Sequence, residues 1–123
     1  MLKTVKEVIV SSVVLIVLDM AFLYVNKDAF RNLIASVQRV IVQFKPEGAI
    51  ICYLLLVFVI NYFIISKKRS ILEAFMLGFV INGVYESTNY AFLKKWSPYL
   101  AIMDTLWGGT LFATTTAVTY AVL

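Results

Sequence analysis

The stretch VYESTNYAFLKKWSPYLAIMDTLWGG, residues 84–109, contains two apolar segments separated by a short polar turn. Within the turn, Ser97 and Pro98 form a helix-start signal, because serine caps a helix and proline is tolerated in its first turn. The flanking segments contain two acids, Glu86 and Asp104, at positions that are otherwise apolar. The stretch therefore predicts two helices joined by a tight turn, with acidic side chains inside both.

The whole chain is too apolar to be a water-soluble domain of its size. It has 123 residues, of which 62% are hydrophobic and 15% are charged, and its mean hydropathy is +0.90. Four apolar runs reach the roughly 18 to 20 residues that are needed to cross a bilayer. They cover residues 8–25, 48–65, 71–93 and 99–123. We therefore expect an all-α integral membrane protein, with a single domain of four transmembrane helices over residues 1–123.

The first apolar run has an alternative interpretation as a cleavable signal peptide. Asp19 interrupts its apolar core, however, and the sequence that follows, FLYVNKDAF, contains no pair of small residues in the spacing of a cleavage site. We therefore expect this run to remain as a helix of the mature chain.

Helix-start signals precede the first three runs. Thr4 and Glu7, in TVKE, have capping-box spacing ahead of the first run, and Ser70 and Glu73, in SILE, have the same spacing ahead of the third. Pro46 falls in the first turn of the second run, where proline is tolerated. Glu73 is therefore interpreted as a capping residue and not as a functional acid.

The segment NKDAFRNLIASVQRVIVQFK, residues 26–45, is too polar to span a bilayer. Its apolar side chains recur at helical spacing while its basic side chains fall elsewhere, which is typical of an amphipathic helix. The apolar set is Phe30, Leu33, Ile34, Val37, Ile41 and Phe44. We expect a helix that lies along the membrane surface. The alternative is an ordinary loop packed on the bundle.

The orientation of the chain is only weakly indicated. Lysines and arginines are nearly balanced between the two ends of the predicted bundle, so the positive-inside rule gives little information. The compact KKR turn, residues 67–69, favours a cytoplasmic location for both termini. On the opposite face, Trp96, Tyr99 and the adjacent lysines are expected to anchor the turn at the membrane interface.

Three acids and a tyrosine are predicted at one depth. Counting from the ends of the runs at about 1.5 Å per residue places four polar side chains roughly 9 to 11 Å below the same face. They are Asp19, Tyr53, Glu86 and Asp104. Because an unpaired charge is costly in low dielectric, the acids must be neutralised by protonation, by a bound cation or by basic side chains of the surface helix. Arg31 and Arg39 are the basic candidates.

Helical periodicity adds further residues to this predicted site. Asn82, Glu86 and Asn89 share one stripe of the third run, and Asp104 and Trp107 share a stripe of the fourth. The candidate ligand-binding or cation-binding residues are Asp19, Tyr53, Glu86, Asn89, Asp104 and Trp107. Asp19, Tyr53 and Trp107 also have structural interpretations, as capping or packing residues.

Another face of the last run carries a small residue at every fourth position. The series is Thr105, Gly109, Ala113, Ala117 and Ala121. A ridge of this kind lets a neighbouring helix approach closely. We therefore expect Gly109, Ala113 and Ala117 to pack against another helix.

Several classes of site and partner are excluded by composition. The chain has one cysteine, Cys52, and no histidine, which excludes an intrachain disulfide and any histidine-based metal site. We expect no cofactor. The net charge of +4 lies at the ends of the runs, where it would face lipid head groups, so the lipid bilayer is the expected partner and nucleic acid is a poor fit.

Three segments have a recognisable pattern: LDMAFL at 18–23, PEGAIICYLLL at 46–56, and YESTNYAFLKKW with DTLWGG between 85 and 109. They resemble a predicted membrane protein family filed as domain of unknown function 2177, in which Thr-Asn-x-Ala-x-Leu-Lys-x-Trp precedes Asp-x-x-Trp-Gly. The matching residues are Leu18, Asp19, Thr88, Asn89, Ala91, Leu93, Lys94, Trp96, Asp104, Trp107 and Gly108. The family more often has Asp at the position of Glu86 and Trp at that of Phe22. The resemblance implies a small four-helix membrane protein, known from bacteria and large DNA viruses, with no established activity.

Three classes of function remain. The first is a small transporter or channel-like protein whose acidic cluster binds a cation or proton, and a chain this small would then need a homo-oligomer. The second is a lipid-binding protein that holds a head group; a lipid-handling enzyme is less expected, because no activated nucleophile or metal-ligand set is present. The third is a structural membrane component, for example of a viral inner membrane.

Overall fold

The computed structural model describes residues 2–38 and 45–123. These residues form α1 (Leu2–Val25), α2 (Lys27–Gln38), α3 (Pro46–Ile60), a π-helical turn η1 (Asn61–Ile65), α4 (Ile71–Phe92) and α5 (Pro98–Val122). No strand occurs in the described ranges. The all-α class predicted from the sequence is therefore confirmed.

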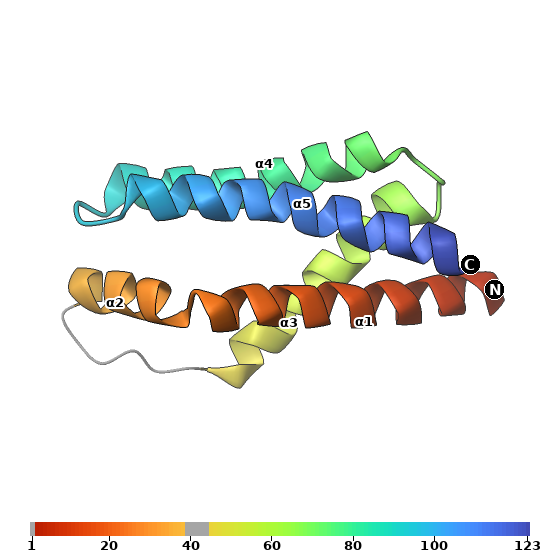
Figure 1. Ribbon diagram of the computed structural model, residues 1–123, viewed down its shortest axis with the longest axis horizontal. Helices are drawn as coiled ribbons and strands as arrows, with labels where there is room; N and C mark the ends of the chain where they lie inside the picture. The colour runs from red at the N-terminus through yellow and green to blue at the C-terminus, as the bar shows by residue number, and fades with distance from the viewer. Residues whose placement is uncertain (1, 39–44) are drawn as a thin grey trace.

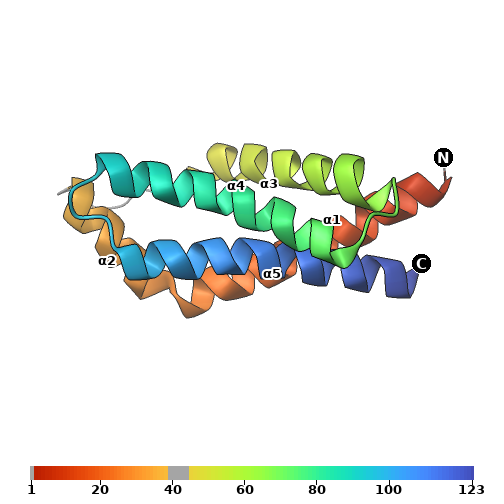
Figure 2. The same cartoon turned by 90° about the horizontal axis from the view of Figure 1, so that it is seen from above.

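The helices form an elongated bundle (Figure 1). α4 and α5 run antiparallel as a hairpin, α1 lies beside α5, and α3 crosses α1 obliquely. Both termini lie at one end of the bundle, together with the turn between η1 and α4. The turn between α4 and α5 lies at the other end, close to α2 (Figure 2). Residues 66–70 and 93–97 therefore mark opposite ends of the molecule.

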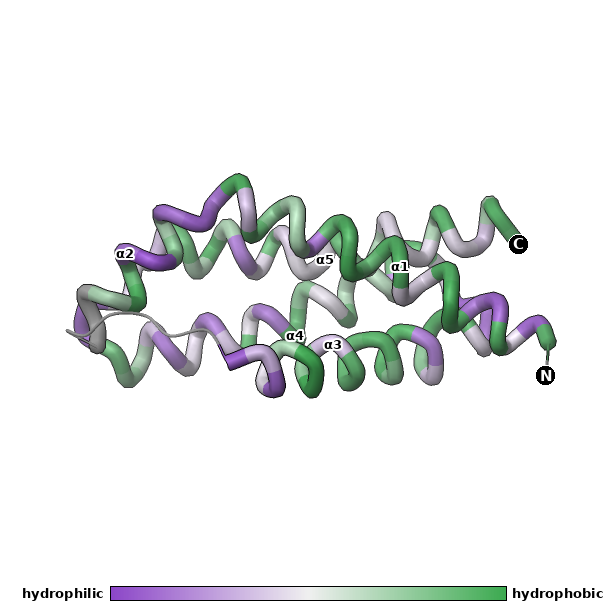
Figure 3. Tube along the Cα trace, turned by 90° about the horizontal axis from the view of Figure 1, so that it is seen from below, coloured by the Kyte–Doolittle hydropathy of each residue, from purple (hydrophilic) through white to green (hydrophobic). Residues whose placement is uncertain are grey.

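The number of apolar spans differs from the prediction. Among the described residues, two helical segments, Leu2–Val25 and Pro46–Ile65, are long and apolar enough to cross a membrane by length and composition, and not four. α4 and α5 are of similar length, but polar residues are interspersed along them, whereas hydrophobic residues dominate α1 and α3 (Figure 3). The acids, asparagines and threonines of the hairpin thus lower its hydropathy.

Two of the predicted helix starts are confirmed in detail. The Ser70 hydroxyl accepts a hydrogen bond of 3.1 Å from the Glu73 amide, and the Glu73 carboxylate accepts one of 3.3 Å from the Ser70 amide, so α4 begins with a capping box. Ser97 caps α5 by accepting a 3.2 Å bond from the Leu100 amide, and Pro98 occupies the first turn.

The predicted start of α1 is wrong. α1 already begins at Leu2, so Thr4 lies inside the helix and cannot cap it. Glu7, its expected partner in a capping box, is instead buried, with 8% of its surface exposed. The TVKE motif therefore marks no helix boundary, because the chain continues the helix on the N-terminal side of it.

The predicted amphipathic helix is present as α2, so the alternative of an ordinary loop is wrong for residues 27–38. Its apolar side chains, Phe30, Leu33 and Ile34, pack against the α4–α5 turn and the start of α5. The apolar partners there are Leu93, Trp96, Leu100, Ala101 and Met103. Arg39, Ile41 and Phe44 lie outside the described residues. The position of α2 relative to a membrane surface stays a prediction.

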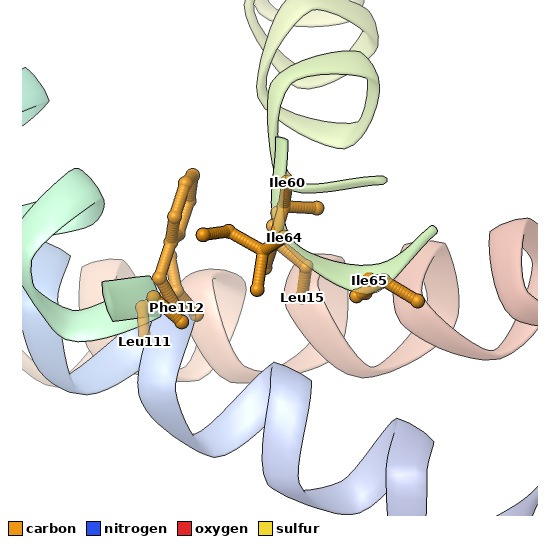
Figure 4. Close-up of a cluster of buried hydrophobic side chains, with 7 residues drawn as sticks. Leu15, Ile60, Ile64, Ile65, Leu111 and Phe112 are labelled. Atoms are coloured by element: carbon orange, nitrogen blue, oxygen red, sulfur yellow. The ribbon is translucent and has the colours of Figure 1, made fainter. Parts of the chain in front are cut away.

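The main hydrophobic core lies where α1, the end of α3, η1, α4 and α5 meet (Figure 4). Its buried members are Leu15, Ile60, Ile64, Ile65, Ala74, Leu111 and Phe112. Many other large apolar side chains are exposed, above all on α1 and α4. Exposed apolar faces of this extent are expected for helices that contact lipid.

The α4–α5 hairpin is held closely by glycines. A Cβ atom on Gly78 would collide with the backbone carbonyl of Gly108, and one on Gly108 would lie 2.5 Å from the Asn82 side chain. A Cβ atom on Gly109 would lie 2.7 Å from the Phe75 ring. Gly109 of the predicted small-residue ridge therefore faces α4, but the closest backbone approach is at Gly78 and Gly108. Ala113 and Ala117 are half-buried, and their predicted helix contact stays a prediction.

Candidate functional site

Asp19 lies at a junction of three helices. Its Oδ2 atom accepts a hydrogen bond of 2.6 Å from the Tyr53 hydroxyl of α3, and its Oδ1 atom accepts one of 2.9 Å from the indole nitrogen of Trp107 in α5. The Phe22 ring stacks on Trp107 with centroids 4.7 Å apart and planes 3° from parallel. Both carboxylate oxygens of Asp19 are thus occupied by neutral donors.

Glu86 is the most deeply buried of the three acids, with 3% of its surface exposed. Its Oε1 atom accepts a hydrogen bond of 2.8 Å from the indole nitrogen of Trp96. Trp96 is itself buried and belongs to the cluster that packs on α2. The prediction that Trp96 anchors the turn at the membrane interface is therefore wrong, because its polar edge is directed inward to a carboxylate.

Asp104 is half-buried beside Glu86. The two carboxyl groups lie close enough to interact with each other, and Asp19 is near enough to act on Asp104 electrostatically. The Asn82 amide donates a bond of 3.0 Å to the Asp104 backbone carbonyl, which fixes the register of α4 against α5. A hydrogen bond between two carboxyl groups needs one proton between them, because two carboxylates offer acceptors only.

Basic side chains do not reach these acids in the part of the chain that the structure describes. Arg31 pairs with Asp28 at 2.8 Å on the exposed face of α2, and the other ion pair joins Arg69 to Glu73. The prediction that Arg31 neutralises the cluster is therefore wrong, and Arg39 lies outside the described residues. The side chain of Asn89 is half-buried and makes no hydrogen bond within residues 2–38 and 45–123.

Similarity to known proteins identifies the family of this chain. The model of a family described as "Predicted membrane protein (DUF2177)" matches residues 4–121. The chain belongs to this family. The resemblance expected from the Thr-Asn-x-Ala and Asp-x-x-Trp-Gly motifs is thereby confirmed, and a lipid bilayer is the environment of the protein. No curated protein and no solved structure matches the chain.

The family motif coincides with the contacts of the site. Trp96 and Trp107, two of the motif residues, supply the indole donors to Glu86 and Asp19. Asp104, a third, touches Glu86. In this chain, two tryptophans of the motif therefore donate hydrogen bonds to carboxyl groups.

A cleft of about 460 Å³ opens between α4 and α5 next to Glu86. Its walls are mostly apolar and include Phe79, Tyr90, Ile102 and Leu106. Gly83 on α4 and small residues on α5 leave room for it. The buried carboxyl pair is consequently bordered by an apolar cleft and not by a charged channel.

A three-ligand metal site is not formed by these acids. In the described ranges, no group of three or more His, Cys, Asp or Glu side chains is close enough to hold a metal ion. Asp19 is held by Tyr53 and Trp107, while Glu86 and Asp104 contact each other. The cluster is therefore one carboxyl pair with a third acid beside it.

A second polar contact lies nearer the end of the bundle that carries the termini. The Asn61 amide, at the start of η1, donates a bond of 2.9 Å to the fully buried Ser11 hydroxyl of α1 and one of 2.8 Å to the Val57 carbonyl. Ser11 shares a buried face of α1 with Glu7, four residues earlier. This contact joins helices and has the geometry of a structural bond.

Proposed function

We propose that this protein is a multi-pass membrane protein in which α4 and α5 cross the bilayer alongside α1 and α3. The hairpin helices contain 22 and 25 residues, enough to span the hydrocarbon layer. Their acids and Asn82 face the partner helix, while apolar side chains such as Val84 and Tyr85 are exposed. A hairpin that buries its polar groups against itself can lie in lipid at lower mean hydropathy than a single helix.

We further propose that the Glu86–Asp104 pair binds a proton inside the bundle and that the protein is a small proton-linked transporter or channel-like protein. The observation that carries this proposal is the contact between two carboxyl groups with no basic partner in the described residues. Such a pair gains and loses one proton as a unit. Ionisable groups at this depth are typical of proton relays.

A route to the pair is supported by the cleft beside Glu86, which reaches the surface of the hairpin. Its apolar walls would exclude ions while the carboxyl pair accepts a proton. One chain of this size encloses no pathway by itself, so the proposal includes a homo-oligomer. The exposed apolar side chains of α3, such as Ile51, Leu54 and Phe58, are suited to contact a second copy within the membrane.

A structural role is the second candidate, and the surroundings of Asp19 favour it. Tyr53 and Trp107 satisfy both of its oxygens, so this acid ties α1, α3 and α5 together without a ligand. In that case the cluster fastens the bundle, and the protein is a structural component of its membrane. The two candidates predict different effects of removing one carboxyl group: a loss of proton transport for the first, and a loss of stability for the second.

Proton flux into proteoliposomes tests the proposal. Vesicles with an imposed pH gradient and a pH-sensitive dye inside should lose the gradient when they contain the wild-type protein. Glu86→Gln and Asp104→Asn keep the shape of the side chains but remove the ionisable pair, so each should lower the rate by at least about tenfold. Glu73→Gln is the matched control, since it alters an exposed capping acid on the same helix.

Wild-type vesicles that keep their gradient would overturn the proposal, as would unchanged rates in both pair variants. Circular dichroism and gel filtration of each variant establish that it is folded. A loss of thermal stability in Glu86→Gln, with no proton flux in the wild-type protein, would instead support the structural role.

A further inference from the structure

A second cavity, of about 380 Å³, lies at the end of the bundle that carries both termini. It is formed by the first turns of α1, the turn between η1 and α4, and the last turns of α5. The residues that line it are Lys3, Glu7, Lys68, Thr119, Tyr120 and Leu123. This end lies far from the Glu86–Asp104 pair, and its two lysines and one glutamate give it opposite charges side by side.

Glu7 is the buried charge of this cavity. Its side chain is 92% buried, yet it makes no hydrogen bond or ion pair within the described ranges. Glu7 lines the cavity, so a cationic group that enters it can pair with this carboxylate without a competing donor from the described residues. The group that fits is a cation with several N–H donors, such as a primary ammonium.

Lys68 is held in an unusual backbone conformation. Its φ of 52° lies in the left-handed region, which glycine and asparagine favour at the ends of helices. The turn is fixed by bonds from the Lys68 amide to the Ile65 carbonyl at 3.1 Å and from the Arg69 amide to the Ile64 carbonyl at 2.9 Å. These two bonds are those of a usual helix C-terminus with a left-handed residue, and they hold Lys68 at the edge of the cavity.

Lys3 and Lys68 are brought together at the mouth of the cavity. The side-chain contact with Lys3 and the repulsion between the two ammonium groups lower the pKa of Lys68 below its ordinary value. Glu7 acts in the opposite direction. An anion between the two lysines would remove the repulsion and accept hydrogen bonds from both.

We infer that this cavity binds the head group of an aminophospholipid, with the phosphate between Lys3 and Lys68 and the primary ammonium on Glu7. The cavity presents two cations and one anion, which complement a head group that has a phosphate and an amine. Its volume lies within the range of about 300 to 1,000 Å³ that is usual for small-ligand sites. Exposed apolar residues nearby, including Leu2, Val5 and Val122, offer a surface for the acyl chains.

The location favours a lipid over a soluble ligand. The cavity lies at the ends of α1 and α5, and the head groups of a bilayer lie at the ends of the helices that cross it. Phosphatidylcholine has the same phosphate, but its quaternary ammonium has no N–H group to donate to Glu7. Discrimination between the two lipids therefore reports on Glu7, and binding of the phosphate reports on the lysines.

Native mass spectrometry of the detergent-solubilised protein tests the inference. Phosphatidylethanolamine is added in one sample, phosphatidylcholine of identical chains in a second, and free phosphoethanolamine in a third. We expect the first lipid to be retained at least about tenfold more than the second and more than the free head group. Equal retention of both lipids would overturn the assignment of Glu7, and equally tight binding of free phosphoethanolamine would overturn the assignment to a membrane lipid.

Variants separate the two halves of the site. Glu7→Gln should abolish the preference for phosphatidylethanolamine over phosphatidylcholine while some binding of both remains. Lys68→Gly should lower binding of both lipids, yet it should keep or raise the melting temperature, because glycine adopts a φ of 52° without strain. Lys67→Ala is the control, since it removes one charge from the same turn but does not line the cavity. Retention by Lys68→Gly at the wild-type level, or the same loss in Lys67→Ala, would contradict the inference.

Discussion

The indole nitrogen of Trp96 lies 2.8 Å from the Oε1 atom of Glu86, and both side chains are nearly completely buried. This bond joins the α4–α5 turn to a carboxyl group inside α4, ten residues earlier in the chain. The same tryptophan packs against Leu33 of α2. Trp96 therefore couples the amphipathic helix, the turn and the buried carboxyl pair in one contact.

Replacement of Trp96 by phenylalanine should destabilise the protein. The ring would keep much of its packing, but Glu86 would lose its donor in a buried environment, at a cost of about 1 to 3 kcal/mol. Thermal unfolding in detergent measures this as a lower melting temperature. Tyr99→Phe is the control and should leave the melting temperature unchanged, because Tyr99 is 75% exposed.

Removal of the Tyr53 hydroxyl should loosen α3. Tyr53→Phe deletes the 2.6 Å bond to Asp19, and hydrogen bonds to charged groups contribute roughly 1.5 to 3 kcal/mol. A lower melting temperature in detergent measures this loss of stability. Tyr62→Phe, on an exposed face of η1, should behave as wild type; equal effects of both changes would contradict the assigned role of Tyr53.

The close approach of α4 and α5 predicts a strong effect of a single methyl group. Gly78→Ala would place a Cβ atom against the Gly108 carbonyl, a backbone atom that cannot move aside, so a loss of about 1 to 3 kcal/mol is expected. Gly48→Ala is the matched control, because nothing lies within 4 Å of a Cβ atom there and alanine favours the helix. Denaturant unfolding of the two variants should therefore give shifts of opposite sign.

The arrangement of the two turns predicts their accessibility. Lys68 and Lys94 lie in turns at opposite ends of the bundle. If the proposed hairpin crosses the membrane, single cysteines at these positions, in a Cys52→Ser background, should react with a membrane-impermeant reagent from opposite sides. Labelling of both from the same side of sealed vesicles would contradict the proposed topology.

Local sequence signals determined where most helices begin. The Ser70–Glu73 capping box, the Ser97 cap and the prolines at the starts of α3 and α5 depend on neighbours within three residues, so the sequence was sufficient to predict them. The amphipathic pattern was also sufficient to predict α2, because the spacing of apolar residues shows which face of a helix is apolar. Among these helix-start signals, only TVKE gave a wrong prediction, because the same spacing also occurs inside a continuing helix.

The sequence by itself also determined the membrane class, because composition is a property of the chain alone. The common depth of the acids stays a prediction. Which side chains meet was decided by the tertiary structure, since it depends on the rotation of each helix about its axis and on its neighbours. The donors to Asp19 come from α3 and α5, and Glu86 receives its donor from a turn whose tryptophan was expected to face outward. α4 and α5 approach each other most closely at Gly78 and Gly108. The sequence could not single out these glycines, because a glycine allows a close approach only where the backbone of another helix lies against it.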